Sequence, residues 1–384
     1  MKDPVPARRL RRPGSWLDLL VSVGFVLGLF VPGVALAAGY RPAGIENRDP
    51  AAAPRIGVDS VADGTFFAAL DRFVTDNFPL RTQFVAVQAA IDFRVLGGTT
   101  NPDVMRGTDD WLFLTGELQP RCDFDVDTLL ARVDEAAAAL ERVGKPFRYV
   151  VVPDKHSIYP ERVLPGSAAG SCTDAGRERL RAGLLARPDI AVELWTGLLA
   201  EKARDPGVPL YYVQDAHWTT LGATVGIRAL VESLAPGTWD DAEVVVGGDQ
   251  RHSSDLARLI GLPRIEVVLR VQMRPGVTAD KRIIDPGVDI SNSRDIPWFT
   301  VRTDRPLVPG RTLFVYDSFF ATQMSSIVPW FEESIWVHEG DLFNLPEIAT
   351  VLPEFDTVVF QRIERSALFT DPASDLRTII AGLR

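Results

Sequence analysis

The chain has few histidines and few cysteines, with four and two among its 384 residues. Zinc sites draw their ligands from closely spaced residues of these two kinds. Here the four histidines are scattered and the two cysteines stand far apart, so the sequence excludes a zinc finger or zinc ribbon. We expect neither a metal nor a cofactor.

The two cysteines are Cys122 and Cys172. In an oxidising compartment they can pair, and the bridge would close a loop of about 50 residues. Two free thiols are the alternative.

The N-terminal region is basic and then apolar. Residues 1–15 carry five basic residues, and the run over 16–38 contains one charge, Asp18. About 20 apolar residues cross a bilayer, and a basic flank stays in the cytoplasm. The pattern predicts a transmembrane anchor over 16–38 with residues 1–15 in the cytoplasm. The alternative is a signal peptide with a small-residue cleavage site at Ala35-Leu36-Ala37.

Both alternatives place the rest of the chain outside the cytoplasm. Residues 39–59 have the composition of a linker, and 60–384 form the predicted catalytic domain. The whole chain has a net charge of −10, from 41 basic and 51 acidic residues. Removing the five basic and two acidic residues of 1–40 leaves 36 and 49, a net charge of −13. Such an acidic domain argues against a nucleic-acid partner, which needs a basic surface.

Several short apolar runs alternate with helical patterns. Continuous apolar runs are typical of strands that are buried on both faces of a parallel sheet. They predict an α/β fold with a mostly parallel central sheet flanked by helices. The expected strands are FRYVVVP (147–153), LYYV (210–213), TLFVYD (312–317), SIWVH (334–338) and TVVFQRI (357–363). Residues 240–310 interrupt the alternation and predict a β-rich insertion.

Asp215 and His217 follow the expected strand 210–213. In an extended segment residues i and i+2 point to the same side, so the two side chains would lie together. A carboxylate beside an imidazole fixes its tautomer and stabilises its protonated form, as a general base requires. A structural pair at the start of a helix, capped by Thr219 or Thr220, is the alternative.

Ser318 follows the expected strand 312–317 and precedes a helical pattern. At such a turn its backbone N–H lies at a helix N-terminus and can bind an oxyanion. The alternative is an N-capping serine. Asp317 beside it is expected to brace the turn through backbone hydrogen bonds.

Short motifs in a fixed order resemble the bacterial alginate O-acetyltransferase family, a branch of the SGNH-type hydrolases. The N-terminal apolar segment is followed by seven motifs: ENR (46–48), DNFPLR (76–81), GTDDWLFLTGE (107–117), VVPDKHSIYPE (151–161), DAHW (215–218), DSF (317–319) and FQRIER (360–365). The resemblance covers about residues 44–368.

The resemblance implies an SGNH-like fold with a permuted block order, in which Asp215 and His217 precede the nucleophile Ser318. It implies an O-acetyltransferase that passes acetyl groups through an acetyl-serine to hydroxyls of an extracytoplasmic polysaccharide. It also implies a polytopic membrane acyltransferase as the partner that delivers the acetyl donor. Tyr316 departs from the glycine of many SGNH proteins, and no Gly-x-Asn block is found for a second oxyanion donor.

Two other function classes stay open at this point. A carbohydrate acetylesterase would use the same triad, with water as the acceptor. A non-catalytic scaffold of a polysaccharide export complex would need no triad at all. A shallow, solvent-open site favours the esterase, and an intact triad geometry counts against the scaffold.

Further residues are candidates for substrate binding. Lys155 follows a core strand and can bind a carboxylate of an acidic sugar or support the fold. Trp218 can pack in the core or stack on a sugar. The remaining histidines are His338 at a strand end, His156 in an expected loop, and His252, which we expect to be solvated.

Overall fold

The computed structural model of the chain divides into two compact units. It describes residues 16–40, 50–79, 81–118, 122, 124–166, 171–262, 264–287 and 296–369. Unit 1 contains residues 1–96 and 258–262, and unit 2 contains 97–257 and 263–384. Unit 2 begins at Gly97, and the catalytic domain that the sequence predicts over 60–384 stays a prediction. The predicted cytoplasmic segment, 1–15, lies outside the described residues.

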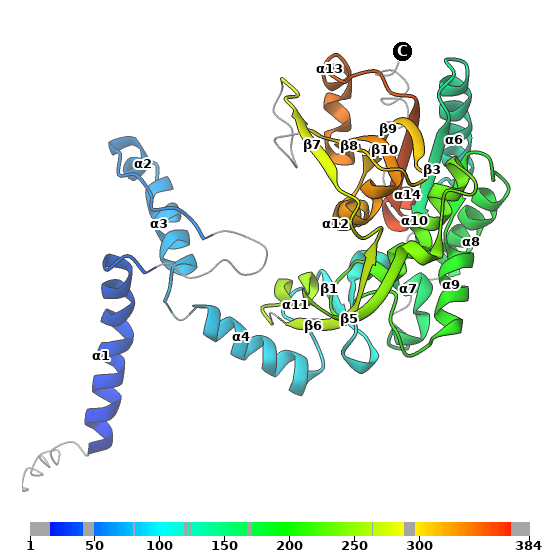
Figure 1. Cartoon of the computed structure of the whole chain (residues 1–384). Coiled ribbons are helices and arrows are strands. Elements are labelled where there is room, and N and C mark those ends of the chain that lie inside the picture. The colour runs from blue at the N-terminus through cyan, green and yellow to red at the C-terminus, as the bar shows by residue number, and fades with distance from the viewer. Residues whose placement is uncertain are drawn as a thin grey trace, which may run out of the picture. The chain divides into compact units, whose positions relative to one another are not determined.

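Unit 1 is helical. Its elements are α1 (Trp16–Ala37), α2 (Val58–Ala62), α3 (Thr65–Asp76), α4 (Arg81–Ile91) and a π-helical turn (Asp92–Leu96) (Figure 1). In the described part of the chain, no helix has both the length and the apolarity that crossing a bilayer requires. The transmembrane anchor predicted over 16–38 is therefore not supported.

Unit 2 is built around a seven-stranded mixed sheet with the order β4-β3-β11-β9-β10-β8-β7. The five strands from β4 to β10 are parallel, and β8 and β7 join antiparallel at one edge. The strands are β3 (Phe147–Val152), β4 (Ala191–Glu193), β7 (Ala279–Ile284), β8 (Ile296–Val301), β9 (Val308–Tyr316), β10 (Phe331–His338) and β11 (Thr357–Ile363).

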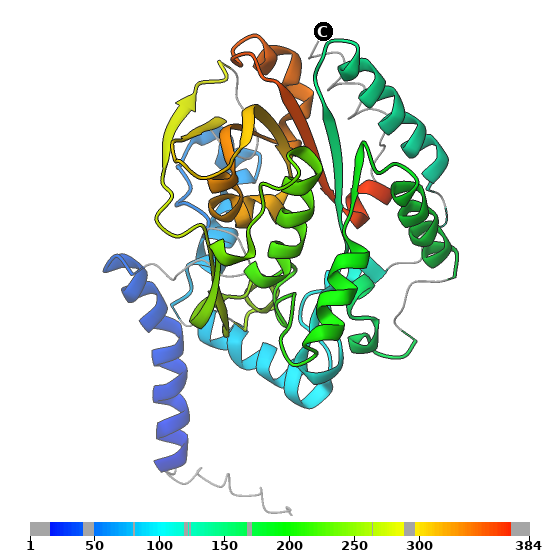
Figure 2. The same cartoon turned by 45° about the vertical axis from the view of Figure 1, so that its right-hand side comes forward.

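Helices pack on both sides of this sheet. Helices α6 (Val126–Glu141) and α8 (Ser171–Leu185) pack together and against β3 and β4. Helix α12 (Ser318–Ile327) packs against β9, β11 and α10 (Thr220–Leu234). Figure 2 shows these two groups of helices on opposite sides of β3 and β11. Because β11 is buried along its whole length and β3 along almost all of it, both form the centre of the core.

The remaining elements surround this core. The helices are α5 (Thr115–Leu118), α7 (Lys155–Ile158), α9 (Trp195–Arg204), α11 (Asp255–Leu259), α13 (Leu345–Ala349) and α14 (Glu364–Phe369). Strands β1 (Val104–Arg106) and β2 (Leu112–Leu114) form one two-stranded sheet, and β5 (Val244–Ser253) and β6 (Ile265–Met273) form another.

Four of the five strands predicted from apolar runs are confirmed, namely β3, β9, β10 and β11. The fifth prediction, a core strand over 210–213, is wrong. Tyr211 forms only an isolated bridge, to Trp218, and the segment contributes no strand to the sheet. The segment is apolar because it belongs to the core as a loop, with Leu210 and Tyr211 buried.

The predicted β-rich insertion over 240–310 divides in two. Strands β5 and β6 form a separate ribbon, whereas β7 and β8 extend the edge of the main sheet. The ribbon matters for the candidate site, because His252 on β5 and Glu266 on β6 contact the segment that carries Asp215 and His217.

Candidate active site

Asp215 and His217 lie in a closed loop between Tyr211 and Trp218. The backbone N–H of Tyr212 donates to the carbonyl of His217 over 3.1 Å, and that of Thr219 to Leu210 over 2.8 Å. Thr219 then caps α10 by accepting from Gly222 N, as predicted. The helix therefore fixes one end of the loop.

The carboxylate of Asp215 holds His217 in two ways. Its Oδ1 accepts the backbone N–H of His217 over 2.9 Å, and it is 2.8 Å from the Nδ1 of the same residue. The first bond is the local turn that an aspartate makes with the residue two positions on. The predicted pairing is therefore present, but a turn produces it and not an extended strand.

Ser318 is the first residue of α12, directly after β9. The N-cap is Asp317, whose carboxylate accepts from Phe319 N over 2.8 Å, so Ser318 is not the capping residue. Asp317 also accepts from Gln361 Nε2 and from Ile363 N, both on β11. As predicted, Asp317 braces the turn. Its bonds leave the Ser318 side chain exposed at the helix N-terminus.

The fold brings the three residues into one hydrogen-bonded chain. His217 Nε2 lies 3.0 Å from Ser318 Oγ, although the residues are 101 positions apart. The opposite ring nitrogen faces Asp215. Because the carboxylate fixes Nδ1 as a donor, Nε2 is the nitrogen that can accept the serine proton. The arrangement is that of a nucleophile, a general base and an orienting acid.

The electrostatics of the loop favour a charged imidazole beside a charged carboxylate. Burial alone would raise the pKa of Asp215, but hydrogen bonds from His217 and His252 outweigh it and hold that pKa well below its ordinary value. Burial alone would lower the pKa of His217, but the bond and charge of Asp215 raise it above 6.5. His217 is therefore stabilised as the imidazolium that proton transfer from a serine creates.

A second carboxylate, Asp255 at the start of α11, supports the loop. Its Oδ1 accepts the backbone N–H of Ala216 over 2.9 Å, and its Oδ2 lies 3.6 Å from His217 Nδ1. The ligand atoms of Asp215, His217 and Asp255 lie within 4.8 Å of one another, a spacing that suits a metal ion. Since the same atoms are engaged in hydrogen bonds within the loop, we assign them to orienting His217.

His252 was missed by sequence reasoning. It lies on β5, and its Nε2 is 2.7 Å from Asp215 Oδ2. The expectation that it is solvated is wrong, because its ring also stacks on Tyr212 at 3.8 Å between centroids. Its 35-residue separation from His217 gives no local signal, so only the three-dimensional pairing reveals it.

Lys155 and Trp218 are not available to a substrate. The Nζ of Lys155 is fully buried and donates to the carbonyls of Leu112, Val213 and Asp215 at 2.6, 2.9 and 3.1 Å. All three ammonium donors are thus engaged, and burial lowers the pKa of Lys155 to about 8. Trp218 is also fully buried, and its indole donates to the carbonyl of Phe319. Both residues support the loop from inside.

Tyr316, at the usual glycine position, is buried. Its ring packs edge-on against Trp336 and His338 on the neighbouring strand. His338 Nδ1 accepts from the backbone N–H of Gly340, which places it in a structural role. His156 is buried rather than in an exposed loop, with Nδ1 at 3.6 Å from a carboxylate oxygen of Glu117.

Cys122 is disulfide-bonded. The side chain of its predicted partner, Cys172, lies outside the described part of the structure, so the Cys122–Cys172 pairing stays a prediction.

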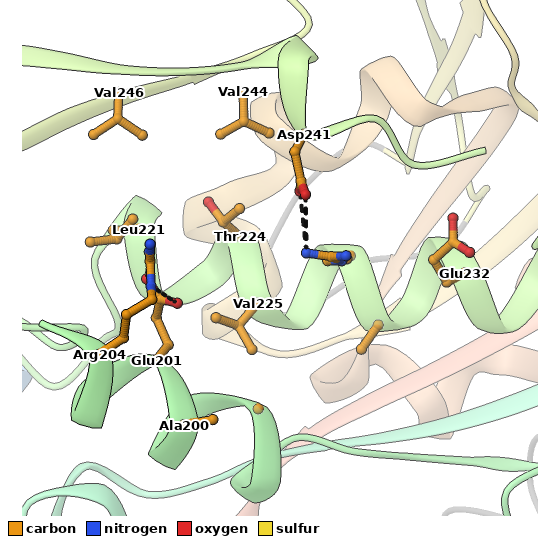
Figure 3. A pocket seen from close by; sticks show the side chains of 13 residues that line it. Ala200, Glu201, Arg204, Leu221, Thr224, Val225, Glu232, Asp241, Val244 and Val246 are labelled. Atoms are coloured by element: carbon orange, nitrogen blue, oxygen red, sulfur yellow. Dashed lines mark hydrogen bonds and ion pairs between the residues drawn. The ribbon is translucent and has the colours of Figure 1, made fainter. Parts of the chain in front are cut away.

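A groove of about 850 Å³ lies between α9, α10 and the start of β5 (Figure 3). The arginines that line it are paired, Arg204 with Glu201 and Arg228 with Asp241. None of the triad residues lines it. The groove is therefore separate from the candidate active site.

Comparison with known sequences finds a similar family over part of the chain. Residues 104–283 match the family described as ALGX, an SGNH hydrolase-like domain of the acetyltransferase AlgX. The matched segment contains Asp215 and His217 and ends before Ser318. The predicted resemblance to the alginate O-acetyltransferase family is confirmed by this match and by the relatives below.

Two curated relatives are probable alginate O-acetylases named AlgJ. The protein of Pseudomonas fluorescens is 25% identical over 184 residues, 47% of this chain and 45% of its own length. That of Pseudomonas syringae pv. tomato is 26% identical over 182 residues, 46% and 44% of the two chains. The chain thus spans about half the length of the curated relatives it matches.

Comparison with solved structures finds one with the same fold. PatB1 of Bacillus cereus, solved with a sulfonyl adduct, has a TM-score of 0.51 and 10% identity over 71% of this chain and 99% of its own. The O-acetyltransferase domain of Pseudomonas putida AlgJ has a TM-score of 0.49 and 18% identity over 73% and 98%. The predicted SGNH-hydrolase-like α/β fold is confirmed by the family match and the likeness to PatB1.

Proposed function

Because residues 104–283 match an SGNH hydrolase-like acetyltransferase domain, we propose that this protein is an O-acetyltransferase that modifies a polysaccharide. One observation carries the proposal. Ser318, His217 and Asp215 form a continuous chain of contacts at 3.0 and 2.8 Å that ends in an exposed hydroxyl. A structural pair would not need to present a serine to solvent.

In the proposed reaction Ser318 Oγ attacks the carbonyl carbon of an acetyl donor. His217 Nε2 takes the serine proton and gives it to the leaving group of the donor. The backbone N–H of Ser318, at the N-terminus of α12, faces the developing oxyanion. A sugar hydroxyl then gives its proton to His217 and attacks the acetyl-serine, which restores Ser318 and forms the sugar acetate.

A carbohydrate acetylesterase is the second candidate, because the exposure of Ser318 leaves water free to act as the acceptor. The two reactions share the acetyl-serine and differ only in the nucleophile that resolves it. The ordered triad geometry counts against a non-catalytic scaffold.

The names of the relatives guide the cellular proposal. Their names as probable alginate O-acetylases favour a catalytic domain outside the cytoplasm, an extracytoplasmic polysaccharide as acceptor, and a polytopic membrane acyltransferase that supplies the acetyl donor. Membrane attachment through residues 16–38 belongs to the same proposal. Fractionation of cells that express the full chain tests it, since a chain recovered only in the soluble cytoplasmic fraction would contradict both attachment and export.

The catalytic test uses the full-length chain with a chromogenic acetyl ester, with and without an oligosaccharide acceptor. We expect Ser318→Ala and His217→Ala to lose acetyl release by a factor of at least about 10³. Ser325→Ala, an exposed serine of the same helix, is the matched control and keeps wild-type rates. Acetyl found on the sugar supports the transferase, and acetate found only in water supports the esterase. Equal rates for wild type and Ser318→Ala would refute both.

A further inference from the structure

The carboxylate of Asp215 is shared between two histidines. Its Oδ1 contacts His217, and its Oδ2 contacts His252 Nε2 at 2.7 Å and accepts the backbone N–H of Asp255 over 2.9 Å. Both oxygens are therefore fully engaged. A triad needs only one of these histidines, so the second calls for an explanation.

His252 is held firmly although it lies on an otherwise exposed ribbon. Most residues of β5 are exposed, but the ring of His252 contacts Asp215 through Nε2 and stacks on Tyr212. A stacked ring with a charge-assisted hydrogen bond has few other orientations. The ribbon thus presents one imidazole in a fixed position.

The same ribbon binds the backbone of the catalytic loop. Glu266, which pairs with His252 across the two strands, accepts the backbone N–H groups of Val213 and Gln214 at 2.7 and 2.9 Å. Ser254 in turn donates to the carboxylate of Glu266. The ribbon and α11 therefore fix the loop at consecutive positions from 213 to 216, and His252 is the part of this support that reaches Asp215 itself.

We propose that His252 is a positioning residue that holds the second oxygen of Asp215 and takes up part of its charge, and so sets the orientation and basicity of His217. Its role in acetyl transfer rests on the proposed function, whereas its effect on His217 does not.

The sign of the effect follows from the charge of Asp215. A hydrogen bond to a carboxylate disperses its negative charge, and a protonated His252 would oppose it directly. In either protonation state His252 weakens the stabilisation of the His217 imidazolium. Losing His252 should therefore raise the pKa of His217. If replacing His252 instead let Asp215 move away from His217, the pKa of His217 would fall, because the imidazolium would lose its carboxylate partner.

The other charged groups around His252 act on both histidines. From the loop these are Asp215 and the phenol of Tyr212, from β6 Glu266, and from α11 Asp255. Behind the loop, the ammonium of Lys155 contacts the carbonyl of Asp215. All of them remain in place when His252 alone is replaced, so a change in titration reports on His252.

The test is an NMR titration of His217 in the full-length chain carrying isotope-labelled histidine. With four histidines in the sequence, replacing each in turn assigns the ring signals. In His252→Leu we expect the midpoint of His217 to move upward by roughly half a unit to one unit. His252→Gln, whose amide can still donate to Asp215, should restore much of the wild-type midpoint. Arg251→Gln, an exposed neighbour on β5, is the control without effect.

Kinetics with the acetyl ester give the second measurement. In His252→Leu we expect kcat to fall roughly tenfold with little change in KM, and the acid limb of kcat/KM to shift upward with the NMR midpoint. An unchanged or lowered His217 midpoint in His252→Leu would overturn the proposal. The two proposals can also fail separately. If the His217 midpoint rises in His252→Leu but the wild type has no activity that depends on Ser318, the proposed function is refuted and the positioning role stands.

Discussion

Asp215 and Glu364 are both buried carboxylates with a partner at each oxygen. Asp215 contacts His217 through one oxygen and His252 and Asp255 N through the other. Glu364, at the start of α14, accepts from Asp154 N and Ser157 Oγ through one oxygen and pairs with Arg177 at 3.0 Å through the other.

The two carboxylates differ in the chains of contacts that start from them. From Asp215 the chain of contacts continues through His217 to the exposed hydroxyl of Ser318. From Glu364 it leads to Arg177, which is itself buried and whose guanidinium also donates to the carbonyl of Glu117. Both carboxylates are therefore buried and paired, and a titratable group with a path to solvent separates the proposed active site from the structural one.

Asp215→Asn is expected to have the largest effect on activity. An amide can hold the wrong tautomer of His217 and cannot stabilise its imidazolium, so kcat should fall by roughly 10⁴. Hydrolysis of the chromogenic acetyl ester measures this loss, and circular dichroism checks that the fold is retained. A loss of less than tenfold in a folded variant would remove Asp215 from the proposed triad.

Glu364→Gln is the matched change in the structural carboxylate. It leaves the buried Arg177 facing a neutral amide, so we expect the free energy of unfolding to fall by about 3 kcal/mol. Urea unfolding measures the loss. The activity of the folded fraction should stay at the wild-type level, and a loss of kcat comparable to that of Asp215→Asn would erase the distinction between the two carboxylates.

The smallest expected effect is on the pH dependence of the wild type. Because the pKa of His217 is raised, kcat/KM should increase with pH through an apparent value above 6.5. The same shift stabilises the folded chain below pH 6.5, and this contribution is lost as the pH rises through the folded-state value. A pH profile of acetyl release measures the acid limb of kcat/KM. An apparent pKa below 6.5 for this limb would contradict the assignment of His217 as the general base.

The sequence predicted those parts of the fold that rest on local patterns. The continuous apolar runs at 147–153 and 357–363 became the central strands because only burial on both faces tolerates such runs. The run at 210–213 looks the same but forms a loop. A short apolar segment indicates burial, but it does not tell whether the segment is a strand or a loop.

The site was predictable where its residues are neighbours in sequence or share a motif. Asp215 and His217 lie two positions apart, and Asp317 identified the turn at Ser318. The position of Lys155 after a core strand was predicted, but whether its ammonium binds carbonyls or a substrate depends on segments distant in sequence. His252 depends on the ribbon folding back onto the loop, which no local pattern encodes.

The brace under Ser318 also bears on the order in which the protein becomes active. Asp317 exchanges two hydrogen bonds with Gln361 and accepts a third from Ile363, and both partners belong to β11, the last of the described strands. A growing chain emerges at about 5–20 residues per second, so the turn at Ser318 lacks this brace for several seconds after the serine itself has been synthesised. Ser318 is therefore braced only after β11 has been synthesised, and a polypeptide interrupted before β11 would carry Asp215, His217 and Ser318 without this support for the turn.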